Sequence, residues 1–139
     1  RRQPPRGLWD RKLYQKMIGQ QDKGIRRAGE DNQHLAGVMR ASHVLRDLPD
    51  KARLLLARRA ELLVMEHLDH VFSRGDYADA CYIVLAGEVD LIVPDATDSK
   101  LDMRLSKVSA GHSIGDLALL RPEAPRVHHA VATLGPFPK

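Results

Sequence analysis

The sequence predicts a mainly β domain preceded by helices, folded as an antiparallel β-roll or jelly roll. Two observations carry this prediction. Short apolar segments separated by glycine turns run from about residue 61 to residue 133, whereas residues 8–56 place their apolar side chains at helical spacing. Short strands joined by tight turns are typical of rolls and jelly rolls, so we expect the helices to lead into a roll.

Three helices are expected before the roll. Apolar residues recur at helical spacing from Leu8 to Ile18, and this stripe packs either on the main domain or on a partner. A second helix begins after Asp31 or Asn32, both good N-caps, and runs to about Arg46. Pro49 breaks that helix and starts a short third one through Leu56.

The strands of the roll follow in order. Gly75, Gly87 and Gly111 mark turns, and Pro94 ends a strand before the polar loop over residues 95–100. Within Val89–Val93 the residues Val89, Leu91 and Val93 share one face. The expected strands are residues 61–66 and 69–72, Cys81–Leu85, Val89–Val93, Met103–Val108 and His128–Thr133.

Composition limits the classes of protein. The chain of 139 residues is 43% hydrophobic and 29% charged, as in soluble globular proteins. No apolar run approaches the roughly 18 residues of a membrane span, and a lone cysteine, Cys81, favours a reducing setting. We therefore expect a cytoplasmic protein without a membrane span.

Charge is unevenly spread along the sequence. Residues 1–28 hold nine Lys and Arg against two Asp, a net charge of +7, although the whole chain carries only +4. Such a basic segment can meet an acidic protein surface, anionic lipid or nucleic acid, and a solvated helix explains it equally well. We expect a protein partner here, whereas nucleic acid is disfavoured because charge alone is a weak signal.

Two stretches near the end of the chain predict an anion site. Ile114-Gly115-Asp116-Leu117-Ala118-Leu119-Leu120 reads as a glycine turn that opens a short helix, and Pro125-Arg126-Val127-His128 follows after four residues. Backbone N–H groups at a helix start attract anions, and a guanidinium adds a charge-assisted clamp. The carboxylate of Asp116 suits a neighbouring hydroxyl, so the ligand is expected to be a sugar phosphate.

These residues resemble the phosphate-binding cassette of cyclic nucleotide-binding domains, which runs Phe-Gly-Glu-Leu-Ala-Leu and then Pro-Arg-Ala-Ala. Residues 72–89 also look like the first hairpins of that family. Ile114, Asp116 and His128 depart from the cassette pattern. The resemblance implies an antiparallel β-roll of the cyclic nucleotide-binding type.

The resemblance also assigns ligand-binding roles. Arg126 pairs with the cyclic phosphate, and its plain alternative is an internal ion pair with a loop carboxylate. Asp116, one methylene shorter than the family's glutamate, accepts the ribose hydroxyl, and His128 occupies the place of a small pocket residue. The expected ligand-binding residues are Gly115, Asp116, Leu117, Ala118, Pro125, Arg126, Val127 and His128.

The C-terminal residues depart from the resembling family. Family members continue with another strand and two helices that cover the base, whereas Pro136 and Pro138 forbid a helix or central strand here. We therefore expect a C-terminally truncated domain without lid helices, or one completed by another chain. The expected division is residues 1–33 as a basic helical or extended segment, 34–135 as the incomplete cyclic nucleotide-binding-like domain, and 136–139 as a tail.

The functional prediction is a non-catalytic regulatory module that binds cAMP or cGMP and passes its occupancy to a partner or neighbouring domain. The alternative is a degenerate roll that binds no nucleotide and serves as a scaffold. A transcription regulator is disfavoured because no helix-turn-helix follows the roll. We expect no enzyme activity, cofactor or metal, because no acid–base pair or metal-ligand spacing is present, and Arg74-Gly75-Asp76 reads as a hairpin turn.

Overall fold

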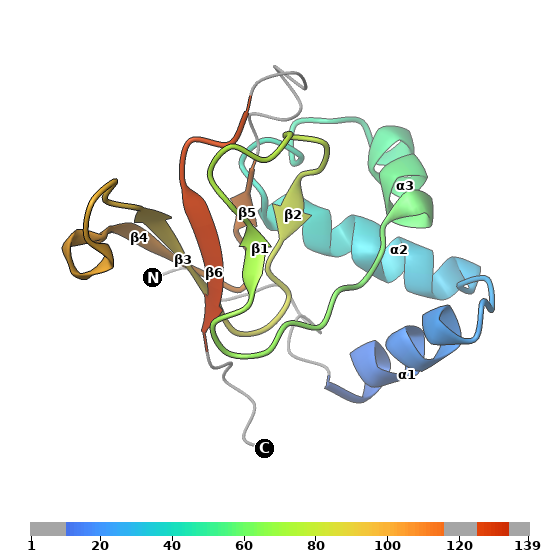
Figure 1. Ribbon diagram of the computed structural model, residues 1–139. Coiled ribbons are helices and arrows are strands. Elements are labelled where there is room, and N and C mark those ends of the chain that lie inside the picture. Colours follow the sequence, from blue (N-terminus) through green and yellow to red (C-terminus); the bar gives the residue numbers. More distant parts are fainter. Residues whose placement is uncertain (1–10, 116–124, 134–139) are drawn as a thin grey trace. The chain divides into compact units, whose positions relative to one another are not determined.

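The computed structural model describes residues 11–115 and 125–133, and these form two compact units (Figure 1). The first unit covers residues 1–64 and is called the helical unit below. The second covers residues 65–139 and is called the β unit. Helices before an antiparallel roll are the predicted fold class, which the structure confirms. A functional division at residue 33 stays a prediction, and a helix runs through that residue.

The helical unit holds α1 (Arg11–Asp22), α2 (Gly29–Val38), the short 3-10 helix η1 (Met39–Ala41) and α3 (Asp50–Arg59). The helix predicted from Leu8 onward extends past Ile18 to Asp22, and residues 8–10 lie outside the described residues. Its apolar stripe is buried as helical spacing requires. The buried apolar side chains of this unit are Tyr14, Met17, Leu35, Val38, Met39, Leu45 and Ala57.

The prediction that Asp31 or Asn32 caps the second helix is wrong. The cap is Ala28, and both polar residues lie inside the first turns of α2 with buried side chains. Each has a partner that replaces water: Lys16 Nζ lies 3.4 Å from the Asp31 carboxylate, and Arg27 donates to Asn32 Oδ1 at 3.3 Å. The helix also ends at Val38 and not near Arg46, which lies in a turn after η1.

Two arginine side chains of the helical unit donate hydrogen bonds to backbone carbonyl groups. Arg27 Nη1 donates to the Ala57 carbonyl at 2.7 Å and its Nη2 to the Ala60 carbonyl at 2.7 Å, at the C-terminal end of α3. The Ala57 carbonyl also accepts the Ala60 N–H at 3.3 Å, and carbonyls at a helix C-terminus lack the usual intrahelical partner, so Arg27 acts as a cap. Buried Arg53 donates to the carbonyls of Leu45, Arg46 and Leu48 and to the carboxylate of Asp50.

The predicted strand over residues 61–66 is wrong. This segment has no strand hydrogen bonding, and Leu63 and Val64 are exposed. The side-chain amide of Gln21 takes the place of a neighbouring strand, because it donates to the Leu62 carbonyl and accepts from the Leu62 N–H, both at 2.9 Å. An apolar run is therefore extended here without belonging to a sheet.

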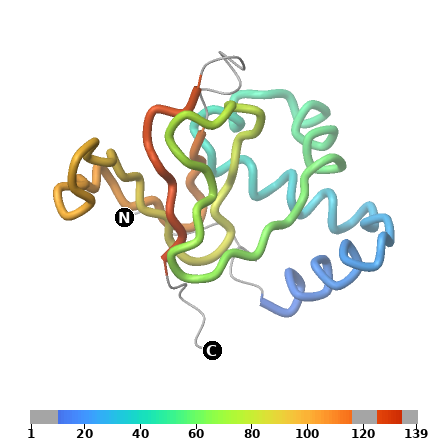
Figure 2. Tube along the Cα trace, viewed as in Figure 1, coloured from blue at the N-terminus to red at the C-terminus, as the bar shows by residue number. Residues whose placement is uncertain are grey.

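The β unit contains a four-stranded and a two-stranded antiparallel sheet. In the first, the order is β1 (His70–Phe72), β6 (His129–Thr133), β3 (Glu88–Val93) and β4 (Met103–Ser109). In the second, β2 (Tyr82–Ile83) pairs with β5 (Ser113–Ile114), a strand that the sequence analysis missed. Strands β1 and β6 run side by side although they are far apart in the sequence (Figure 2).

A bulge lies on β4 opposite β3, whereas β3 pairs with β6 residue by residue without a shift. Leu91 faces Ser106 but Ile92 faces Arg104, so Leu105 is the extra residue on β4. Val89 and Leu91 face the core as expected, and Val93 at the end of the strand is half-buried. The core of this unit consists of Phe72, Val84, Val89, Val108, Ile114 and Ala130.

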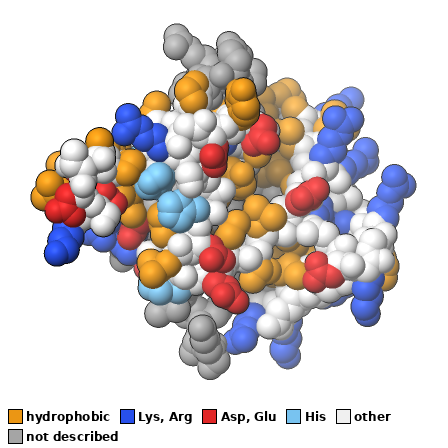
Figure 3. Space-filling model, viewed as in Figure 1, with side chains coloured by type: hydrophobic (Ala, Val, Ile, Leu, Met, Phe, Trp, Pro, Cys, Tyr) orange, Lys and Arg blue, Asp and Glu red, His pale blue; other side chains and the backbone are white. Residues whose placement is uncertain are grey.

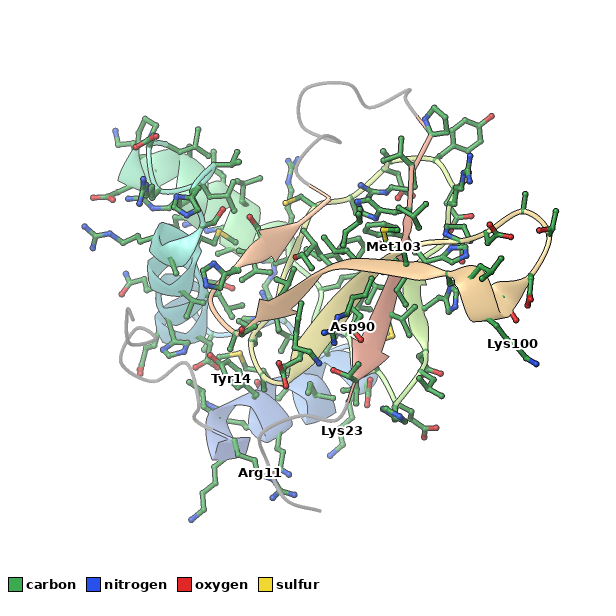
Figure 4. All side chains as sticks on the ribbon, turned by 90° about the vertical axis from the view of Figure 1, so that its left-hand side faces the viewer. Arg11, Tyr14, Lys23, Asp90, Lys100 and Met103 are labelled. Atoms are coloured by element: carbon green, nitrogen blue, oxygen red, sulfur yellow. The ribbon has the colours of Figure 1, made fainter. Side chains whose placement is uncertain are left out.

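The loop that joins β3 to β4 includes the 3-10 helix η2 (Ser99–Leu101) and is organised by Asp95. Its carboxylate accepts the Thr97 hydroxyl at 2.7 Å and the N–H groups of Thr97 and Asp98 at 3.0 and 2.9 Å. The Thr97 hydroxyl, followed by these two N–H groups, lowers the pKa of the Asp95 carboxyl. Lys100 projects away from the sheet at this end of the hairpin (Figure 4).

Candidate functional site

The backbone of Arg126 is fixed against the turn that follows β1. Gly75 donates to the Arg126 carbonyl and Arg126 donates to the Asp76 carbonyl, both at 2.8 Å. Gly75 adopts φ +92°, a conformation that glycine takes without strain. The N–H of Arg74 in the same turn donates to Nδ1 of His129 at 3.0 Å. The predicted hairpin turn at Arg74–Asp76 therefore positions the arginine of the expected anion site.

The side chain of Arg126 lies inside the β unit with only 7% of its surface exposed. Its guanidinium carbon lies 4.2 Å from the centre of the Phe72 ring, a cation–π arrangement. Nη1 donates to the Gly115 carbonyl at 3.2 Å, and Nη2 donates to the Ala80 carbonyl. The buried Nε has no hydrogen-bond partner among the described residues. The guanidinium is thus held in place by two hydrogen bonds, and its buried Nε–H donor is left without a partner among the described residues.

Gly115 is shaped around this guanidinium. It adopts φ +74°, and a Cβ atom at this position would lie 2.6 Å from Nη1 of Arg126. Both the backbone conformation and the close approach disfavour a larger residue. Gly115 and Arg126, eleven positions apart in the sequence, are therefore brought together as the cassette pattern predicts.

An open hollow of about 510 Å³ lies beside Arg126 in the β unit. Two carboxylates face it, of which Asp76 accepts the Ser73 N–H at 2.9 Å. Three aromatic side chains, Phe72, Tyr77 and Tyr82, also line it, and Tyr77 is largely exposed. The hollow is lined by Val71, Phe72, Gly75, Asp76, Tyr77, Asp79, Tyr82 and Arg126.

The other predicted site residues have different positions. Pro125 forms a β-bridge with Tyr77, and Val127 is exposed. His128 does not line the hollow, because its ring packs on Phe72 with the ring centres 5.7 Å apart. Asp116, Leu117 and Ala118 lie outside the described residues. Their predicted contacts with a ligand stay predictions.

Two contacts of Arg126 were not predicted. Phe72 lies at the start of the stretch that resembles the family's hairpins. From the sequence, however, an aromatic residue in a strand predicts core packing, and nothing predicts that an arginine stacks on it. The Ala80 carbonyl carries no sequence signal at all, since every residue has one. The predicted alternative for Arg126, an ion pair with a carboxylate, is not found among the described residues.

Comparison with known families identifies the β unit. The family model of the cyclic nucleotide-binding domain matches residues 64–134, which is half of the chain. The chain belongs to the cyclic nucleotide-binding domain family. A comparison with curated proteins found no match. The family places Gly115 and Arg126 within a nucleotide-binding fold, in agreement with the resemblance drawn from their sequence motif.

Solved structures share the fold of this cyclic nucleotide-binding domain. The regulatory domain of Toxoplasma gondii PKA, a co-crystal with cAMP, is 23% identical with a TM-score of 0.67, over 78% of this chain and 40% of that chain. The regulatory subunit of a cAMP-independent protein kinase A from Trypanosoma cruzi, bound to guanosine, is 22% identical with a TM-score of 0.64, over 76% and 37%. At these identities the likeness shows the fold alone.

A third structure is the N-terminal domain of a transcriptional regulator from Streptomyces coelicolor, 26% identical with a TM-score of 0.62, over 70% of this chain and 68% of that chain. The present chain spans about 40% of the length of the two kinase regulatory structures. The activities and partners of those larger proteins can therefore only be proposed for this chain.

The described part of the chain shows neither a metal-binding cluster nor a membrane-spanning helix. Residues 11–115 and 125–133 contain no group of three or more His, Cys, Asp and Glu placed to hold a metal ion. Over the same residues, no helix has the length and apolar character needed to cross a membrane.

Proposed function

We propose that this cyclic nucleotide-binding domain binds cAMP or cGMP without chemistry and passes its occupancy to a partner or neighbouring domain. The observation that supports the proposal is the buried Nε of Arg126, which has no acceptor among the described residues. A buried donor without a partner is costly, and a phosphate oxygen would satisfy it with a charge-assisted hydrogen bond.

The geometry favours an anion over a neutral ligand at this position. The Phe72 ring and the two backbone carbonyls hold the guanidinium of Arg126 but do not neutralise its charge. A hydrogen bond that involves a charged group contributes about 1.5–3 kcal/mol, which corresponds to roughly 10- to 100-fold in affinity. A phosphate would therefore bind to the positive charge of Arg126, whose position and orientation the fold has already fixed.

The remaining ligand contacts rest on the family resemblance. Backbone N–H groups of Gly115, Leu117 and Ala118 would bind the phosphate, and Asp116 would accept the ribose hydroxyl. Aspartate reaches roughly 1.5 Å less far than glutamate, and hydrogen-bond lengths vary by only a few tenths of an ångström. We therefore expect weaker binding than the family pattern with glutamate provides. Ligand binding would shift the equilibrium between two conformations of the cassette. The size of this shift depends on how much more tightly the ligand binds one conformation than the other.

A second candidate function, a scaffold that binds no nucleotide, has one observation in its favour. Both Nη groups of Arg126 already donate to backbone carbonyls, so the side chain can serve simply to join the Ala80 and Gly115 segments. In this case the cassette sequence would be retained for packing. The basic N-terminal residues would then carry a protein interaction, in a reducing cytoplasm that lone Cys81 favours.

Calorimetric titration of the whole chain with cAMP, cGMP and guanosine distinguishes the two functions. We expect saturable heat with a cyclic nucleotide and its loss in Arg126→Ala, whereas the control Arg104→Ala, which changes an exposed arginine of the same unit, keeps it. Folding of each variant is checked by circular dichroism. A folded wild type without heat up to millimolar nucleotide would contradict the sensor and leave the scaffold. Equal binding by Arg126→Ala would instead contradict the role that we propose for Arg126.

A further inference from the structure

A second hollow, of about 400 Å³, lies in the helical unit and is lined mainly by cations. Its lining residues are Arg26, Arg27, Asn32, Arg58 and Arg59, and no carboxylate is among them. Figure 3 shows Lys and Arg side chains gathered over the helices of this unit. Residues 1–64 contain 15 Lys and Arg against seven Asp and Glu, so the hollow lies in the part of the chain with excess positive charge.

The fold of the helical unit builds this hollow from distant parts of the sequence. Arg27 donates to the carbonyls of Ala57 and Ala60 and so ties the segment before α2 to the C-terminal end of α3. This tie places Arg26 beside Arg58 and Arg59 in one hollow. Neighbouring like charges repel, and the arrangement persists because Arg27 is held by two hydrogen bonds of 2.7 Å.

Three of the four guanidinium groups are available to a ligand. Arg26, Arg58 and Arg59 are exposed and have no hydrogen bond or ion pair within the residues that the structure describes. The C-terminal dipole of α3 explains why Arg58 and Arg59 are favourable in its last turn. It does not explain Arg26, which lies on a non-helical segment. A hollow that gathers three unpaired guanidinium groups has the donor set of an anion site.

Neighbouring side chains indicate what kind of anion fits. Ile25 precedes Arg26 and is 52% exposed, and Leu55, one turn before Arg58 and Arg59 on α3, is 56% exposed. Carboxylates fit the guanidinium fork, and apolar side chains of the same ligand would cover Ile25 and Leu55. Among the described residues, no aromatic side chain lines the hollow to stack on a nucleic-acid base, and a flat bilayer does not enter a concave site.

We propose that this hollow of the helical unit binds an acidic segment of a protein partner, with glutamate or aspartate carboxylates on Arg26, Arg58 and Arg59 and apolar side chains on Ile25 and Leu55. The proposal rests on the helical unit alone and does not depend on nucleotide binding by the β unit. It places the partner on residues that come together only in the fold.

The test uses the whole chain and a fluorescein-labelled peptide of glutamates and leucines, followed by fluorescence anisotropy. We expect Arg58→Glu/Arg59→Glu to weaken binding on the order of tenfold or more for each guanidinium lost. The matched control Arg40→Glu/Lys51→Glu makes the same change of charge on exposed residues of the same unit that do not line the hollow. We expect this control variant to keep most of the affinity for the peptide.

Several outcomes would overturn the proposal. Absence of binding by the folded wild type, or an equal loss of affinity in the two double variants, would show that no specific site exists. Equal binding of a peptide with glutamine in place of glutamate would exclude carboxylate recognition. Tighter binding, through the same two arginines, of a single-stranded oligonucleotide or of phosphatidylserine vesicles would assign the hollow to another class of partner.

Discussion

Among the residues that the structure describes, the helical unit and the β unit each bury one arginine, and the two side chains are used differently. Arg53 in the helical unit is 4% exposed and donates to three backbone carbonyls and one carboxylate. Arg126 in the β unit is 7% exposed, donates to two carbonyls and keeps a buried Nε without a partner among the described residues. The satisfied arginine maintains structure, whereas the partly satisfied one is suited to a ligand.

The net charges of the two units also have opposite signs. Residues 1–64 carry 15 basic against seven acidic side chains, and residues 65–139 carry seven against 11. The acidic unit nevertheless holds the anion site that we propose at Arg126, so a single buried cation and not the overall charge of the unit would determine binding there. In the basic unit, by contrast, the arginines that we assign to a partner are exposed and act as a group.

The largest effect is expected from Arg53→Met, which keeps the apolar stem and removes every donor. The carbonyls of Leu45, Arg46 and Leu48 lose their charged partner, and an unsatisfied buried acceptor costs about 1–3 kcal/mol. We expect urea denaturation to show a loss of about 3–4 kcal/mol in the free energy of unfolding, on the same principle. Lys51→Met, an exposed change on the same helix, should alter it little; similar losses in both variants would refute a special role for Arg53.

A smaller loss of stability is expected from Gly115→Ala. The new Cβ would lie 2.6 Å from Arg126 Nη1 and the residue would keep φ +74°, so we expect a cost of roughly 1–3 kcal/mol together with loss of nucleotide binding. Gly37→Ala in α2 is the matched change in the other unit, because no atom lies within 4 Å of its added Cβ. It should stabilise the chain by up to about 1 kcal/mol. Equal effects of the two substitutions on urea denaturation would contradict this account of Gly115.

The smallest effect is expected from the pH dependence of the hairpin loop at Asp95. Because hydrogen bonds in the folded state lower the pKa of this carboxyl, its contribution to stability is complete above the ordinary pKa of about 4. That contribution is lost as the pH falls through the lowered value. The difference in unfolding free energy between wild type and Asp95→Asn should therefore stay constant above about pH 5 and shrink in stronger acid. If the difference in unfolding free energy grew on acidification, the pKa of Asp95 would be shifted in the opposite direction, and the prediction would be wrong.

The sequence predicted the β unit better than the helical unit, for physical reasons. Strands such as Glu88–Val93 lie between a glycine turn and a proline, and the cassette motif identified Gly115 and Arg126 correctly as neighbours. Strand β5 has only two residues, too few for a visible alternation. Its partner β2 is equally short but lies within the longer apolar segment Cys81–Leu85, which the sequence marks as a strand.

Errors in the helical unit arose where a side chain replaces a backbone partner. Asp31 and Asn32 have the chemistry of N-caps, but Lys16 and Arg27 allow them to lie inside α2. Residues 61–66 have the apolar content of a strand, yet Gln21 supplies the hydrogen bonds that a neighbouring strand would make. Arginine contacts with carbonyl groups, as at Arg27 and Arg53, follow no periodic pattern and could not be predicted.

The hydrogen bond between the turn after β1 and His129 has a spectroscopic consequence. Since the Arg74 N–H donates to Nδ1, the neutral imidazole must carry its proton on Nε2. The same turn binds the backbone of Arg126 on both sides through Gly75 and Asp76. The nitrogen resonances of a single histidine ring therefore report on the backbone that supports the anion site, without any label attached to the site itself.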